Sequence, residues 1–124
     1  MQKKILLVDD IGFVLELEKE LFQEIEKEKG TSFEIDTASN VSEAIARLDN
    51  TIYDLLITDM NLPDGNGSEI AKEAAAKSSG KTILVALTSM PIAFEDKQEF
   101  FDDYLTKPTS PRDIKKHLLK LVSM

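Results

Sequence analysis

Side chains that could share one piece of chemistry stand at the ends of four apolar runs in this sequence. Asp9 and Asp10 follow "KILLV", Asp59 follows "LLIT", Thr88 ends "TILVALT" and Lys107 ends "YLTK". Together they offer three carboxylates, a hydroxyl and an ammonium group. Clustered carboxylates repel one another, and a divalent cation relieves that repulsion. Because only oxygen ligands are at hand, Mg²⁺ fits best, and it usually shares its shell with a phosphate.

The residue types also divide the roles around such a phosphate. Carboxylates can act as nucleophiles and form aspartyl phosphates, so Asp59 is the predicted acceptor. Lys107 would bring a point charge and Thr88 a hydrogen-bond donor to the phosphoryl oxygens. Each residue alone has a plainer interpretation, as a helix cap, a turn residue, a strand residue or a surface lysine. Their common position at strand ends favours a shared site.

A parallel sheet would bring these residues together. The apolar runs at 4–8, 33–38, 54–58, 82–88 and 104–107 are predicted strands, with amphipathic stretches between them. Five such units without a linker predict a doubly wound α/β fold, a (βα)5 sandwich formed by residues 1–124 as a single domain. Ligands of such sheets bind beyond the carboxyl ends of the strands, where the strand order reverses.

The intervening helices carry their own signals. The first is expected over about residues 11–28, with an apolar face that includes Leu21 and Ile25, and also Val14 and Leu17. Asn40 with Glu43, and Asn66 with Glu69, have the spacing of a capping box, in which the two side chains satisfy each other's backbone N–H groups.

The composition limits the classes of function. The net charge is −8, from 23 acidic and 15 basic residues, which disfavours direct contact with nucleic acid and with anionic membranes. Cysteine is absent, so disulfides, thiolate zinc sites and a cysteine nucleophile are excluded. No apolar run approaches the roughly 20 residues of a membrane span. The opening "MQKKILLVDD" meets two aspartates too early for a signal peptide. We expect a cytoplasmic protein.

The motifs "ILLVDD", "ITDMNLPDGNG", "LVALTS" and "YLTKP" resemble those of response-regulator receiver domains, the CheY-like modules of two-component signalling. The resemblance covers the whole chain and implies one receiver domain, flavodoxin-like, with a five-stranded parallel sheet of order 2-1-3-4-5. It implies a phosphoprotein that uses Mg²⁺ and receives its phosphoryl group from a sensor histidine kinase or a phosphotransfer protein. It further implies a surface that switches and binds an unknown downstream protein, and no enzymatic activity beyond the domain's own phosphoryl transfer and dephosphorylation.

The resemblance assigns roles around the metal and the phosphoryl group. Asp9 and Asp10 match the family's metal-binding acidic pair, Asp59 matches the phosphoacceptor, and Asn61 matches the position whose backbone carbonyl completes the metal shell. The resemblance thus implies a metal site made by these four residues.

Further positions match the family's switch and backbone features. Thr88 matches the switch hydroxyl, Tyr104 the aromatic switch residue, Lys107 the active-site lysine and Gly67 the glycine that opens the third helix. The resemblance also implies a cis peptide bond between Lys107 and Pro108.

Two features depart from the family's pattern. The segment from Thr88 to Lys107, where a helix is expected over about 92–102, is shorter than the family usually has. The sequence "FFDD" stands where an Ala-Gly turn normally precedes the last strand.

Two alternatives remain beside the receiver interpretation. A phosphatase of the haloacid-dehalogenase type would need a second aspartate two residues after the nucleophile, and Asn61 stands there. A pseudo-receiver would be an interaction module that is never phosphorylated, although such modules usually lose an acidic residue or the lysine, and this chain has kept both. His117 is interpreted as an exposed residue of the last helix and not as a phosphotransfer histidine.

Overall fold

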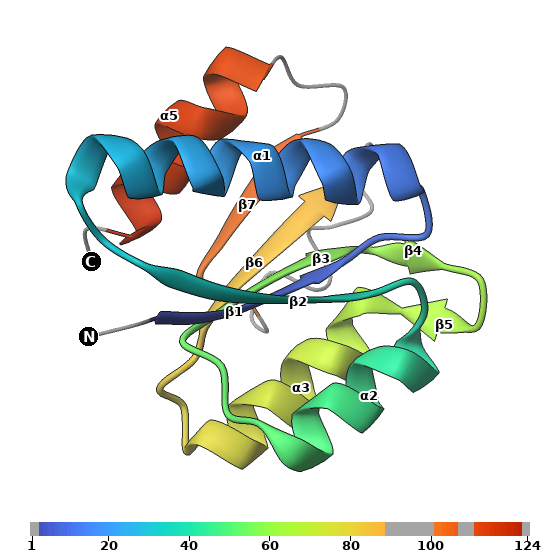
Figure 1. Cartoon of the computed structure of the whole chain (residues 1–124). Helices are drawn as coiled ribbons and strands as arrows, with labels where there is room; N and C mark the ends of the chain where they lie inside the picture. The colour runs from blue at the N-terminus through green and yellow to red at the C-terminus, as the bar shows by residue number, and fades with distance from the viewer. Residues whose placement is uncertain (1–2, 89–100, 107–110, 123–124) are drawn as a thin grey trace.

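The computed structural model describes residues 3–88, 101–106 and 111–122 (Figure 1). Most of the helix expected over about 92–102 lies outside these residues, as do Lys107, Pro108 and the bond between them.

Five parallel strands form the central sheet. They are β1 (Lys3–Val8), β2 (Phe33–Ala38), β3 (Leu55–Asp59), β6 (Ile83–Thr88) and β7 (Asp103–Thr106). Their order is β2-β1-β3-β6-β7, and every neighbouring pair is parallel. The predicted order 2-1-3-4-5 is therefore confirmed, since the two other strands, β4 (Asn61–Leu62) and β5 (Gly65–Asn66), form a separate small hairpin. Each predicted strand begins and ends within one residue of the observed one.

Helices cover both faces of the sheet, as the doubly wound prediction requires. In Figure 1, α1 (Gly12–Lys29) and α5 (Pro111–Val122) lie on one face, and α2 (Val41–Asn50) and α3 (Gly67–Ser78) lie on the other. Within the described part of the chain, no helix combines the length and the apolar character that crossing a membrane requires.

Successive side chains of a strand point to opposite faces of the sheet, so each face has its own hydrophobic core. Ile5 and Leu7 of β1 pack toward α1 and α5, whereas Leu6 and Val8 pack toward α2 and α3. All four side chains are buried, as expected for a central strand covered on both faces.

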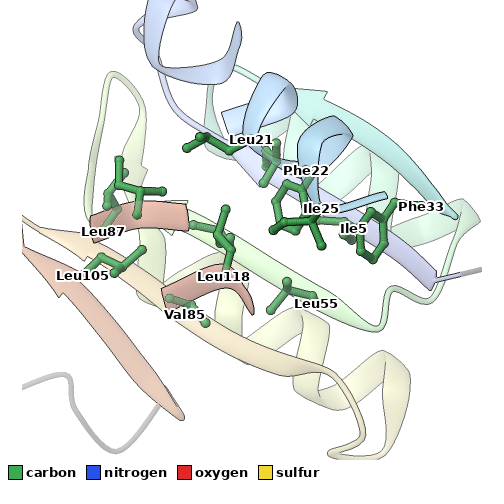
Figure 2. Packing of buried hydrophobic residues seen from close by; sticks show 13 residues of the cluster. Ile5, Leu21, Phe22, Ile25, Phe33, Leu55, Val85, Leu87, Leu105 and Leu118 are labelled. Carbon is green, nitrogen blue, oxygen red and sulfur yellow. The ribbon is translucent and has the colours of Figure 1, made fainter. Parts of the chain in front are cut away.

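The core under α1 and α5 is built around large side chains (Figure 2). Phe22 of α1 meets Phe33 of β2 edge-to-face, with ring centroids 5.3 Å apart. Ile25 of α1 and Leu118 of α5 are both fully buried against the strands. Burial of each such side chain contributes about 1.5–3 kcal/mol, so these contacts fix both helices on the sheet.

The predicted apolar face of α1 is confirmed, and it includes one buried residue more than predicted. Leu21 and Ile25 are buried, and Val14 and Leu17 are partly buried. Phe22 is buried as well. Phe22 was not predicted because the apolar face that we expected is narrower than the side of α1 that packs on the sheet.

The two predicted capping boxes have different outcomes. Asn66 and Glu69 form a complete box at the start of α3, and Asn66 N–H donates to Glu69 Oε2 at 2.8 Å. At α2, Asn40 Oδ1 accepts from Glu43 N–H at 2.8 Å. Glu43 Oε2, however, accepts from the Ser39 hydroxyl at 2.6 Å and from the Asn40 side-chain amide at 3.2 Å. The reciprocal half of that box was therefore wrong, because a closer local donor is available to Glu43.

Candidate functional site

Asp9 and Asp59 come together because their strands are neighbours in register. Val8 of β1 lies opposite Thr58 of β3, so the next residue along each chain is an aspartate at the same level. Asp9 N–H still donates to Ala38 O of β2 at 3.1 Å, which keeps the chain extended one residue past β1. The sheet thus brings two carboxylates from distant parts of the sequence to one edge.

Asp10 completes a compact acidic cluster. Asp9, Asp10 and Asp59 each offer a carboxylate oxygen, and these atoms all lie within 4.8 Å of one another. Asp9 is fully buried, the exposed fraction of Asp59 is 8 %, and Asp10 is exposed. Carboxylates at this spacing repel one another strongly where water is excluded. The cluster therefore has a deep side in the sheet and an open side toward solvent.

Backbone groups orient the two buried carboxylates. Ile11 N–H donates to Asp9 Oδ1 at 2.9 Å. Asn61 N–H donates to Asp59 Oδ1 at 3.3 Å. Both donors lie two residues beyond their acceptors, as in an Asx turn, so each loop bends around the carboxylate that it follows.

The loop after Asp59 is a short structured hairpin, which the sequence did not lead us to expect. β4 and β5 pair antiparallel, with Asn61 opposite Asn66 and Leu62 opposite Gly65. Gly67 N–H then donates to Met60 O at 3.0 Å, which closes the loop at the start of α3.

The absence of a side chain at Gly67 is a steric requirement. A Cβ atom there would collide with the backbone oxygen of Asp59 and press on Thr58 Cγ2. Glycine is the only residue that permits this approach, so the match between Gly67 and the family's glycine has a local physical reason.

Two further predicted site residues, Thr88 and Tyr104, lie on β6 and β7. Leu87 pairs with Asp59, so Thr88 follows at the carboxyl end of β6, where it is buried. Thr88 in turn pairs with Thr106, the last residue of β7. Tyr104 of β7 is exposed over 42 % of its surface. Lys107 follows Thr106 in the sequence and is outside the described residues.

Two further aspartates organise the loops and were missed by the sequence analysis. Asp64, in the turn of the hairpin, accepts from the backbone N–H groups of Val41 and Ser42 in α2. Asp102, in "FFDD", accepts from Leu84 N–H at 2.8 Å, and its own N–H donates to Leu84 O at 2.7 Å. The departure from the Ala-Gly pattern thus forms a regular junction with β6. Neither role had a local signal, because an aspartate beside Pro, Gly or another aspartate is typical of any turn.

The donor set of the acidic cluster fits a hard divalent cation. Among the described residues it consists of carboxylate oxygens without a nitrogen or sulfur ligand, which favours Mg²⁺, Ca²⁺ or Mn²⁺ over zinc or copper. The exposure of Asp10 leaves a side open to water, and Mg²⁺ usually keeps several waters. The residues present therefore agree with the cofactor that the sequence predicts.

The fold and this cluster of carboxylates define a class of signalling domain, and comparison with known families agrees. The model of the response regulator receiver domain matches residues 5–119. The chain belongs to this family of two-component signalling proteins.

Individual relatives show the same assignment. The chain is 34 % identical over 116 residues to the transcriptional regulatory protein ResD of Bacillus subtilis, an alignment that covers 91 % of this chain and 45 % of ResD. The chain thus spans about half the length of the curated relatives it matches.

Solved structures share the fold. The chemotaxis response regulator CheY4 of Vibrio cholerae superposes with a TM-score of 0.80 at 28 % identity, over 98 % of this chain and 99 % of CheY4. The receiver domain of the sensor histidine kinase PA1611 from Pseudomonas aeruginosa has a TM-score of 0.73 at 20 % identity, over 100 % of each chain. That structure is described with a magnesium ion coordinated in its active-site cleft.

Proposed function

We propose that this chain works as a phosphorylation-dependent receiver and that Asp59 accepts the phosphoryl group. The observation that carries the proposal is the gathering of the Asp9, Asp10 and Asp59 carboxylate oxygens within 4.8 Å. Such a cluster is unfavourable unless a cation neutralises it, and membership of the receiver family gives it a purpose.

Mg²⁺ is the proposed cofactor. Asp10 and Asp59 would hold it through their side chains, Asn61 through its backbone carbonyl, and Asp9 partly through water. When bound, the ion supplies positive charge that lets the anionic phosphoryl group approach the carboxylates. The magnesium described in the related kinase receiver supports this choice of metal.

The chain's own groups divide the transfer between them. An oxygen of Asp59 attacks the phosphorus of a phosphohistidine, and an O–P bond forms as the P–N bond breaks. The electron pair of the broken bond stays on the imidazole nitrogen. Thr88 would donate a hydrogen bond to a phosphoryl oxygen, and Lys107 would place its ammonium charge beside another. The three residues Asp59, Thr88 and Lys107 thus form the reacting set.

The proposed partners are proteins. A sensor histidine kinase or phosphotransfer protein donates the phosphoryl group in the cytoplasm, and a downstream protein or segment responds. We propose that residues 1–124 form one receiver domain and that the net charge of −8 keeps this domain itself away from nucleic acid. The transcriptional role named for ResD makes control of transcription one candidate output.

Labelling with a small phosphodonor tests the assignment. Wild-type protein treated with acetyl phosphate and Mg²⁺ should gain one phosphoryl group by mass spectrometry, and Asp59→Asn should gain none. Asp49→Asn is the matched control, because Asp49 is an exposed carboxylate of α2 outside the site. Its labelling should equal that of the wild type.

Other outcomes would overturn the proposal. An unlabelled wild type would indicate a pseudo-receiver that only binds partners. Continuous hydrolysis of phosphate esters would indicate a phosphatase. Undiminished labelling of Asp59→Asn would move the acceptor to another residue.

A further inference from the structure

The side chain of Asp64 connects the hairpin that follows Asp59 to the start of α2. Asp64 Oδ1 accepts from Val41 N–H at 2.7 Å, and Asp64 Oδ2 accepts from Ser42 N–H at 3.0 Å. Val41 and Ser42 are the first two residues of α2. The next donor, Glu43 N–H, is satisfied by Asn40 from the helix's own side. The helix start therefore has two caps, one local and one from a loop more than 20 residues away.

The position of the Asp64 carboxylate at a helix N-terminus strengthens its two hydrogen bonds. A carboxylate that accepts two N–H groups at a helix N-terminus gains from both charge-assisted bonds and the helix dipole. The hydrogen bonds from Val41 and Ser42 hold the pKa of Asp64 below its ordinary value. The carboxylate is therefore ionised at neutral pH and can accept both bonds.

The hairpin is anchored at its two ends by the bonds of Met60 to Leu87 O and from Gly67 N–H and by the Asn66–Glu69 capping box, whereas its turn is held by Asp64. Its ladder contains only two residue pairs, Asn61 with Asn66 and Leu62 with Gly65. Leu62 is buried on the α2–α3 side of the sheet, whereas Asn61 and Asp64 are exposed. A two-stranded hairpin of this length is not stable by itself, so its position depends on contacts with the body of the protein.

We propose that Asp64 is a positioning residue of the metal site: by fastening the β4–β5 hairpin to α2, it holds Asn61 beside Asp59. The inference rests on the proposed function, in which the Asn61 carbonyl is a metal ligand. Asn61 N–H already donates to Asp59 Oδ1 at 3.3 Å, so a shift of the hairpin would disturb both the carbonyl and the acceptor carboxylate. Asp64 itself touches neither the metal nor the phosphoryl group.

Groups that orient metal ligands typically change metal affinity by about 10- to 100-fold when removed. Asp64→Ala should therefore raise the Kd for Mg²⁺ about tenfold, as measured by NMR titration of the backbone amides. Asp64→Asn keeps one acceptor oxygen and should show a smaller rise. In both variants, the amide protons of Val41 and Ser42 should exchange faster with solvent.

Asn40→Ala is the matched control. It removes the other cap of the same helix, the bond from Glu43 N–H, and leaves the hairpin link in place. It should destabilise α2, as the loss of an N-cap does, and leave the Kd for Mg²⁺ within twofold of the wild type. An equal loss of affinity in Asn40→Ala would overturn the proposal, because helix stability alone would then explain the effect.

The failure of this inference can be told from failure of the proposed function. If the wild type binds Mg²⁺ and Asp64→Ala binds it equally well despite faster exchange at Val41 and Ser42, the positioning role is wrong and the receiver site stands. If the wild type shows no binding at millimolar Mg²⁺, the proposed metal site and the role of Asp64 are both overturned.

Discussion

The two glycines that begin helices in this chain differ in how closely another part of the backbone approaches them. Gly67 is the first residue of α3, and Gly12 is the first residue of α1. A Cβ atom at Gly67 would run into the backbone oxygen of Asp59, whereas one at Gly12 would meet nothing within 4 Å. The same substitution at the two sites therefore separates steric fit from intrinsic helix propensity.

Gly67→Ala should lower the free energy of unfolding by about 1–3 kcal/mol, the usual cost of forcing an extra group into a packed site. It should also slow the labelling of Asp59, because the backbone that carries the acceptor must move. Gly12→Ala should leave the free energy unchanged or raise it by up to about 1 kcal/mol, since alanine favours helix. Urea unfolding of both variants measures the difference. Equal effects at both positions would contradict the steric argument.

At the level of elements, β7 carries the residue that we expect to report the state of Asp59. Tyr104 pairs in register with Ala86 of β6 and keeps 42 % of its surface exposed. Thr88, two residues beyond Ala86, is buried at the carboxyl end of the same strand. An exposed ring can gain apolar burial by turning inward, which offsets part of its lost freedom.

Beryllofluoride, which mimics the phosphoryl group, should draw the Thr88 hydroxyl toward Asp59 and turn Tyr104 inward in the presence of Mg²⁺. A partner that prefers one of the two states would then complete the switch. Aromatic NMR shifts of Tyr104, with and without beryllofluoride, measure the change. Asp59→Asn is the control and should not respond. If both side chains keep their rotamers in the wild type, the signal must leave through another face, and the exposed side of α1 is the next to examine.

At the level of the whole molecule, alkaline stability should depend on one buried tyrosine. Tyr53, just before β3, donates from its hydroxyl to Asp36 Oδ2 of β2 at 2.5 Å. Burial, and then the hydrogen bond and negative charge of Asp36, raise the pKa of Tyr53 well above its ordinary value. The folded state thus favours the neutral phenol. Its contribution is fully present below the ordinary tyrosine pKa of about 10 and is lost as the pH rises toward the folded-state pKa.

The free energy of unfolding should therefore fall as the pH increases above about 10. Tyr53→Phe should make this fall shallower, because phenylalanine has no proton to lose from the unfolded chain. Tyr104→Phe is the matched control for the protein's only other tyrosine, and it should keep the wild-type slope. Urea unfolding between about pH 8 and 11 provides the comparison. A slope that Tyr53→Phe leaves unchanged would rule out this source of alkaline sensitivity.

Patterns in the sequence were enough to predict a doubly wound α/β fold and the residue types of the site, whereas the strand order was predicted from the resemblance to receiver domains. The strands β1, β3 and β6 were recognisable because their side chains are buried on both faces, which leaves continuous apolar runs. Asp9 and Asp59 follow such runs in the sequence. Their closeness in space could then be predicted, because the carboxyl ends of all strands in a parallel sheet meet at one edge. These are local patterns with a fixed period, so they can be interpreted without knowing any contact.

The way in which the loops are held depends on contacts between residues far apart in the sequence. Asp64 caps a helix whose first residue is 23 positions earlier, and Asp102 bonds to Leu84 across 18 positions. The carboxylate of Glu43 accepts from the side chains of Ser39 and Asn40 and not from the Asn40 backbone N–H that the capping-box spacing predicted. An aspartate in a turn has the same local propensity whatever it binds, and its partner is fixed only once the sheet has set which loops lie side by side. The acidic cluster could thus be predicted from strand ends, but the link that we propose to hold Asn61 beside it could not.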